Sequence, residues 1–74
     1  MEKEIREILY HYLQEFHPET DIVNYSNDTD LTKIFPFSSF EWMVVICELE
    51  NKLNLHFNED FFTKRTIKAM ENLK

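Results

Sequence analysis

Apolar residues near the start of the chain recur at intervals of three and four, the spacing of one helical face. The members of this stripe are Ile5, Ile8, Leu9, Tyr12, Leu13 and Phe16. His17-Pro18 should end the helix, because a residue that precedes proline is displaced from the α region. We therefore predict a helix over residues 2–16.

A second amphipathic segment begins at a pair of serines, within the sequence FPFSSFEWM at residues 35–43. Ser38 and Glu41 have the spacing of a capping box, with the serine at the N-cap and the glutamate at the third helical position. This signal predicts a helix over residues 39–53. Its apolar stripe consists of Phe40, Met43, Ile46, Leu49 and Leu53.

The second helix carries more apolar residues than one face holds. The additional ones are Trp42, Val44, Val45 and Cys47. A helix of a small domain cannot bury all of this surface, so we expect part of it to face a partner or a ligand.

The connection between these helices, residues 17–38, is longer than most loops in compact domains. We expect its apolar residues to pin it onto the helices: Ile22, Val23, Leu31, Ile34, Phe35 and Phe37. The sequence NDTDL at residues 27–31 predicts a turn with a short helical turn after it.

Two further caps are predicted near the end of the chain. Asn58 is suited to cap a short helical turn over EDFFTK, and Thr66 to cap a final helix. Ile67, Met70 and Leu73 share one face of that final helix. The fold predicted for residues 1–74 is a single all-α domain. It is a small four-helix bundle of three longer helices and one short one, with a long loop between the first two.

Composition narrows the class of function. The chain of 74 residues has fourteen acidic and eight basic residues, a formal net charge of −6, and no glycine. A deficit of lysine and arginine disfavours binding to nucleic acid or to an anionic membrane. No signal-peptide core and no bilayer-spanning apolar run are evident, so we expect a cytoplasmic, soluble monomer.

Catalytic and metal signals are weak. His11, His17, His56 and Cys47 lack the spacing of a metal site, and we interpret the histidines as surface or loop residues. Cys47 is either a reactive thiol or, as we favour, a small apolar residue. No acid and base are paired at useful spacing and no phosphate loop occurs. We expect neither a metal site nor an enzyme.

Nearly the whole chain resembles the acyl carrier protein family, the phosphopantetheine-bearing carriers of fatty acid, polyketide and nonribosomal peptide synthesis. The resemblance rests on the first helix, the long loop with Leu31, and Ser39-Phe40 followed by SFEWMVVICELENKLNL. It continues with the acidic turn NED and a closing helix that starts at Thr66-Ile67. In the family a Gly-x-Asp-Ser-Leu motif presents the serine that carries 4′-phosphopantetheine. The resemblance thus implies that Ser39 is the attachment site.

The resemblance also implies partners. A phosphopantetheinyl transferase would donate the group from coenzyme A, and its thiol would carry an acyl or aminoacyl cargo as a thioester. Acyl-loading, condensing or transfer enzymes, with basic or apolar docking surfaces, would then use the cargo. The second helix would be the recognition helix. Its docking residues would be Ser38, Glu41, Trp42, Val44, Cys47 and Glu48.

The chain departs from the family motif at two positions, where Pro36 replaces the glycine and Ser38 replaces the aspartate. Val44 stands where the family often has a glutamate, which predicts more apolar docking. Alternatives remain open from sequence: Ser39 as a simple helix-start residue, Ser38 as the modified residue, and Trp42 as core or as lining for an acyl chain. A carrier-like interaction module without a prosthetic group is the alternative function.

Overall fold

All regular secondary structure in the described part of the chain is helical. In the computed structural model, the described residues are 1–22, 24–57 and 66–72. They form the helices α1 (Glu2–Phe16), α2 (Leu31–Ile34), α3 (Ser39–Leu53) and α4 (Ile67–Glu71), and they contain no strand. The all-α class and the predicted ranges 2–16 and 39–53 are confirmed. The expected three longer helices are not: within the described residues only α1 and α3 are long.

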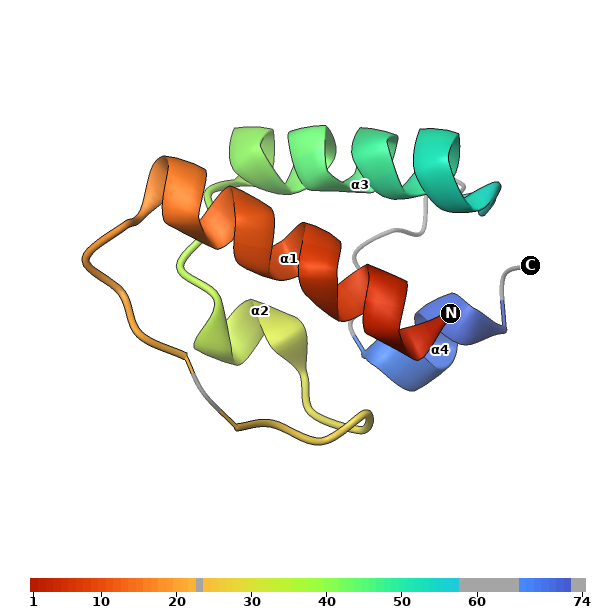
Figure 1. Ribbon diagram of the computed structural model, residues 1–74, viewed down its shortest axis with the longest axis horizontal. Helices are drawn as coiled ribbons and strands as arrows, with labels where there is room; N and C mark the ends of the chain where they lie inside the picture. The colour runs from red at the N-terminus through yellow and green to blue at the C-terminus, as the bar shows by residue number, and fades with distance from the viewer. Residues whose placement is uncertain (23, 58–65, 73–74) are drawn as a thin grey trace.

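The two long helices form the frame of the molecule. In Figure 1, α1 and α3 lie beside each other and run in opposite directions. α1 also packs against α4, while α2 is part of the connection that returns the chain to the start of α3. This arrangement places the first turn of α3 next to the end of α1.

The apolar stripe predicted for α1 faces the core. Ile5, Leu9 and Leu13 are buried, and they follow one another at intervals of four. Ile8, Tyr12 and Phe16 are partly buried against the same core cluster. The helical periodicity therefore identified the buried face of α1 correctly.

The predicted stripe of α3 is wrong at its start. Phe40 and Met43 are 71% and 57% exposed, respectively. The buried residues of this helix are Trp42, Val45, Ile46 and Leu49. They too are spaced at i, i+3, i+4 and i+7, so α3 has two overlapping apolar stripes, and packing determines which one is buried.

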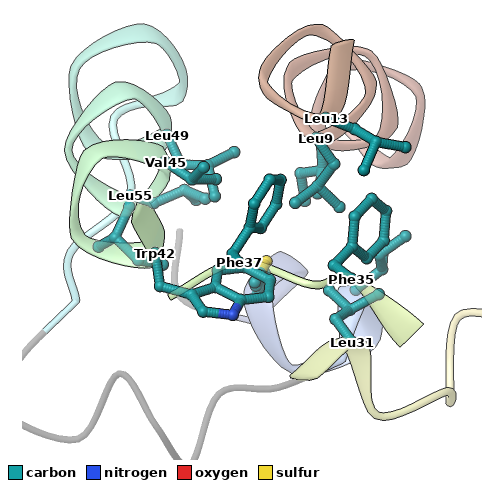
Figure 2. Packing of buried hydrophobic residues seen from close by; sticks show 13 residues of the cluster. Leu9, Leu13, Leu31, Phe35, Phe37, Trp42, Val45, Leu49 and Leu55 are labelled. Carbon is teal, nitrogen blue, oxygen red and sulfur yellow. The ribbon is translucent and has the colours of Figure 1, made fainter. Parts of the chain in front are cut away.

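The long connection contributes a large part of the core, as predicted. Leu31 of α2, Phe35 and Phe37 are buried. Phe37 stacks on Phe35, with ring centroids 5.5 Å apart, and meets Trp42 edge-on at 5.0 Å. Figure 2 shows the Phe37 ring lying between Leu9 and Leu13 of α1 on one side and Val45 and Leu49 of α3 on the other.

Local signals mark where α2 and α4 begin and where α3 ends. Asp30 caps α2 by accepting a hydrogen bond from the Thr32 N–H at 3.1 Å. Thr66 caps α4 by accepting one from the Ala69 N–H at 3.1 Å, as predicted. Asn54 ends α3 in the left-handed region, with a φ of 60°. The chain has no glycine, and asparagine tolerates this conformation better than most other residues do.

Some predictions concern residues outside the described ranges. The place of Val23 in the long connection, the cap at Asn58, the helical turn over residues 59–64 and the place of Leu73 on the final helix all fall there. Among the helices that are described, none is long and apolar enough to span a bilayer.

Candidate functional site at the first turn of α3

The predicted capping box is present at the start of α3. The Oγ of Ser38 accepts a hydrogen bond from the Glu41 N–H at 3.2 Å. In return, Oε1 of Glu41 accepts one from the Ser38 N–H at 2.8 Å. The two hydrogen bonds fix the backbone on both sides of Ser39.

Ser39, the first residue of α3, is exposed. Within the described part of the chain, its hydroxyl has no hydrogen-bond partner, whereas the hydroxyl of Ser38 is used by the cap. The two adjacent serines therefore have different roles. Ser38 holds the start of the helix, and Ser39 presents a hydroxyl to solvent on a fixed backbone.

The environment of Ser39 suits a covalently attached anion better than catalysis by the serine itself. The first N–H groups of a helix lack intrahelical acceptors, and the positive end of the helix dipole favours negative charge there. The cap uses the N–H of Glu41, but no described residue accepts from the N–H groups of Ser39 and Phe40. The Glu41 carboxylate is engaged in the cap, and no described carboxylate is hydrogen-bonded to the Ser39 hydroxyl.

Glu41 has a second partner that the sequence pattern did not reveal. Nε2 of His17, the residue that follows α1, lies 2.9 Å from Oε1 of Glu41. The hydrogen bond from Ser38 and then that from His17 hold the pKa of the Glu41 carboxyl below its ordinary value. The contact spans the gap between two helices, so the local spacing of the capping box gives no sign of it.

An exposed apolar surface continues along α3 from Ser39. A shallow groove is lined by Phe40, Met43, Val44, Cys47, Glu48 and Asn51 of α3 together with Tyr12 of α1. We call this the α3 groove. Cys47 is exposed, and Val44 is half-buried. Three predicted docking residues, Val44, Cys47 and Glu48, thus lie together on the surface that begins beside Ser39.

The other three predicted docking residues do not line the α3 groove. Trp42 is only 6% exposed and packs in the aromatic core, which removes it from any docking surface. Glu41 and Ser38 hold each other in the cap. Phe40 and Met43, which the stripe assigned to the core, take the exposed positions instead.

Glu48 is the acidic member of the groove. Its carboxylate pairs with the Lys52 ammonium at 3.6 Å. Burial and the neighbouring Glu48 carboxylate raise the pKa of the Tyr12 phenol. Glu48 therefore already interacts with Lys52, and most of the other residues that line the groove are apolar.

Histidine, cysteine and carboxylate side chains of the described residues do not gather into a group of three or more that could hold a metal ion. No protein-family model matches the chain, and no curated protein or solved structure is significantly similar to it. The resemblance to acyl carrier proteins therefore rests on the residues of the chain and the order of its helices.

Proposed function

We propose that the chain is a carrier protein that holds an acyl or aminoacyl group on a 4′-phosphopantetheine attached to Ser39. The observation that carries this proposal is the state of the Ser39 hydroxyl. It is exposed, has no hydrogen-bond partner among the described residues, and stands on a backbone held by the Ser38–Glu41 capping box. A serine buried at this position would be incompatible with modification by a second enzyme.

The residues around Ser39 fit the group. A phosphodiester is an anion, and the start of an α-helix stabilises an anion by roughly 0.3–1 kcal/mol at an exposed site. When bound, the group supplies a thiol that holds cargo as a thioester. The chain supplies the hydroxyl on a backbone that the capping box holds. The exposure of Ser39 leaves the solvent side open to the group.

The modifying enzyme has to supply the activation. A serine hydroxyl is a weak nucleophile at neutral pH without an adjacent base, and no described side chain is hydrogen-bonded to that of Ser39. The transferase would remove the Ser39 proton while the serine oxygen attacks the phosphorus atom of coenzyme A that bears the pantetheine. The P–O bond to the adenosine bisphosphate would break, and that nucleotide would leave.

The α3 groove is the proposed docking surface for the transferase and for the enzymes that load or use the cargo. Phe40 directly follows the modified serine, and Met43 lies one turn further along the helix; both are largely exposed. Large exposed apolar side chains are common at the centres of protein interfaces. A partner that places an apolar pocket over Phe40 and Met43 would bring its active site next to Ser39.

Intact-mass measurement tests the proposal. The wild-type chain is incubated with coenzyme A and a broad-specificity phosphopantetheinyl transferase, beside Ser39→Ala and Ser38→Ala. We expect the mass of one phosphopantetheine on the wild type and on Ser38→Ala, with a slower reaction for the latter because its cap is weakened. Ser39→Ala should gain nothing. An unmodified wild type would refute the proposal.

The exposed apolar groove also favours a second candidate, an interaction module without a prosthetic group. Pro36 and Ser38, which replace the glycine and aspartate of the family motif, point in the same direction. In this case Ser39→Ala would leave partner capture intact, while Val44→Asp would weaken it. Trp42→Ala is unsuitable for this comparison, because Trp42 lies in the core.

A further inference from the structure

His17 is held firmly at the end of α1. The backbone N–H of His17 donates to the Leu13 carbonyl at 2.8 Å, and the backbone carbonyl of His17 accepts from the Thr20 N–H at 3.0 Å. The next residue is Pro18, whose ring restricts the backbone further. The imidazole lies against Phe37, with centroids 6.1 Å apart, and is one-quarter exposed. The ring therefore has a defined place beside the segment that leads into α3.

The imidazole is joined to the cap of α3 through a single oxygen atom. Oε1 of Glu41 lies 2.9 Å from Nε2 of His17 and 2.8 Å from the Ser38 backbone nitrogen. A carboxylate only accepts hydrogen bonds, so the histidine nitrogen must be the donor. On the other side of the ring, Nδ1 lies 3.8 Å from the carboxylate of Glu19, which is largely exposed. Glu41 is thus oriented from two directions, by its own helix and by the end of α1.

We infer that His17 is a positioning residue for Ser39, acting through the Glu41 carboxylate. The inference rests on the proposed carrier function, because it concerns how the serine is presented to the modifying enzyme. Ser39 follows Ser38 directly, and the Ser38 N–H is bound to the oxygen that His17 holds. Loss of the imidazole donor frees the Glu41 side chain to rotate away, and the peptide before Ser39 then loses one of its two constraints.

The hydrogen bond between His17 and Glu41 also links the two ends of the long connection between α1 and α3. α1 ends at Phe16, and α3 does not begin until Ser39. Without a direct link, the two ends of this long connection would be related only by apolar packing around Phe37. The hydrogen bond from His17 to Glu41 gives that packing a fixed direction, since hydrogen bonds depend on angle and apolar contacts do not.

Two substitutions separate the donor from the ring. His17→Gln keeps an N–H donor that can reach Glu41 but removes the aromatic contact with Phe37. His17→Phe keeps a ring against Phe37 but removes the donor. A purely structural role for the ring predicts that the phenylalanine variant is the better tolerated. The positioning role predicts the opposite, with rescue by glutamine.

The first readout needs no transferase. Amide hydrogen exchange at Ser38, measured by NMR on the unmodified protein, should become about two- to tenfold faster in His17→Phe, as expected from the loss of one hydrogen bond. In His17→Gln it should stay within about twofold of the wild type, the lower end of the same range. Thermal unfolding of both variants controls for a general loss of stability. Equal exchange rates at Ser38 in all three proteins would overturn the inference.

The second readout is the kinetics of phosphopantetheine transfer with coenzyme A. A smaller fraction of correctly presented Ser39 raises the apparent KM for the carrier and leaves kcat nearly unchanged. We expect this rise in His17→Phe, about two- to tenfold by the same hydrogen-bond argument, and not in His17→Gln. Equal KM values for the two variants and the wild type would overturn the inference while the carrier function stands. A wild type that accepts no phosphopantetheine would overturn the carrier function, and with it the role of His17 in modification.

Discussion

Oδ1 of Asn27 lies 2.6 Å from Nη2 of Arg6, so the middle of the long connection is bound directly to α1. Arg6 also donates to the Tyr25 carbonyl at 3.2 Å and lies over the Tyr25 ring. The side-chain amide of Asn27 donates to Glu2 at 3.1 Å, and the backbone carbonyl of Asn27 accepts from the backbone N–H of Lys68 at 3.0 Å. A single loop residue therefore joins α1, the connection and α4.

Removal of this junction should destabilise the fold. We expect Asn27→Ala to lower the free energy of unfolding by about 1–2 kcal/mol, because its bond to Arg6 is charge-assisted but only partly buried. Asn24→Ala is the matched control, since Asn24 is exposed in the same loop, and its effect should stay within about 0.5 kcal/mol. Urea denaturation measures both. Equal losses would show that Asn27 does not anchor the connection.

The two aromatic residues in the first turn of α3, Phe40 and Trp42, should differ greatly in how much stability their truncation costs. Trp42→Ala removes a buried ring and should cost about 3–5 kcal/mol. This is a large part of the roughly 4–11 kcal/mol expected for a domain of this size. Phe40→Ala, at a position 71% exposed, should change stability by less than about 0.5 kcal/mol. Far-UV circular dichroism during denaturation distinguishes them, and a comparable loss from Phe40→Ala would contradict the exposed placement.

Acid should weaken the start of α3. The folded-state pKa of Glu41 is lowered, chiefly by the Ser38 N–H and then by His17. Its stabilising contribution is therefore fully present above the unfolded-state pKa of about 4.5 and is lost as the pH falls through the lower folded-state value.

Glu41→Gln keeps the shape and an acceptor oxygen but does not titrate, which makes it the appropriate comparison. The stability difference between the wild type and Glu41→Gln should be largest near neutral pH and should shrink below about pH 4. Denaturation midpoints across this range provide the test. A difference that does not vary with pH would mean that the charge of Glu41 contributes nothing to the cap.

The α3 groove should determine affinity for the modifying enzyme. Met43 and Tyr10 are each 57% exposed, but Met43 lies in the groove and Tyr10 lies on α1 outside it. Met43→Asp should raise the KM for the carrier in phosphopantetheine transfer by about tenfold or more, as expected for loss of an apolar anchor. Tyr10→Asp should leave it unchanged. A similar effect from both substitutions would indicate general damage or a docking surface elsewhere.

Helix positions were predictable because their signals are local. The periodicity of α1 and the stop at His17-Pro18 are properties of neighbouring residues, and so is the capping box of Ser38 and Glu41. These signals gave the bounds of both long helices. The exposure of Ser39 also agrees with the sequence, since a cap that uses the Ser38 hydroxyl leaves the next hydroxyl available.

The buried face of α3 was not predictable, because Phe40 and Met43 fit helical spacing as well as Trp42 and Val45 do. The choice depends on Phe37, which packs edge-on against Trp42 and comes from the loop. The contact between His17 and Glu41 has the same character, since it joins residues 24 apart in the sequence. Long-range packing supplied what local patterns could not.

The central claim is the covalent site, and fragment-ion mass spectrometry of the wild-type chain tests it most directly. The chain is treated with coenzyme A and a phosphopantetheinyl transferase, digested, and the peptide spanning both serines is fragmented. We predict that the added mass lies on Ser39, between the fragments that end at Ser38 and those that begin at Phe40. Added mass on Ser38, or an unmodified peptide after complete reaction of a known carrier in the same tube, would contradict the account.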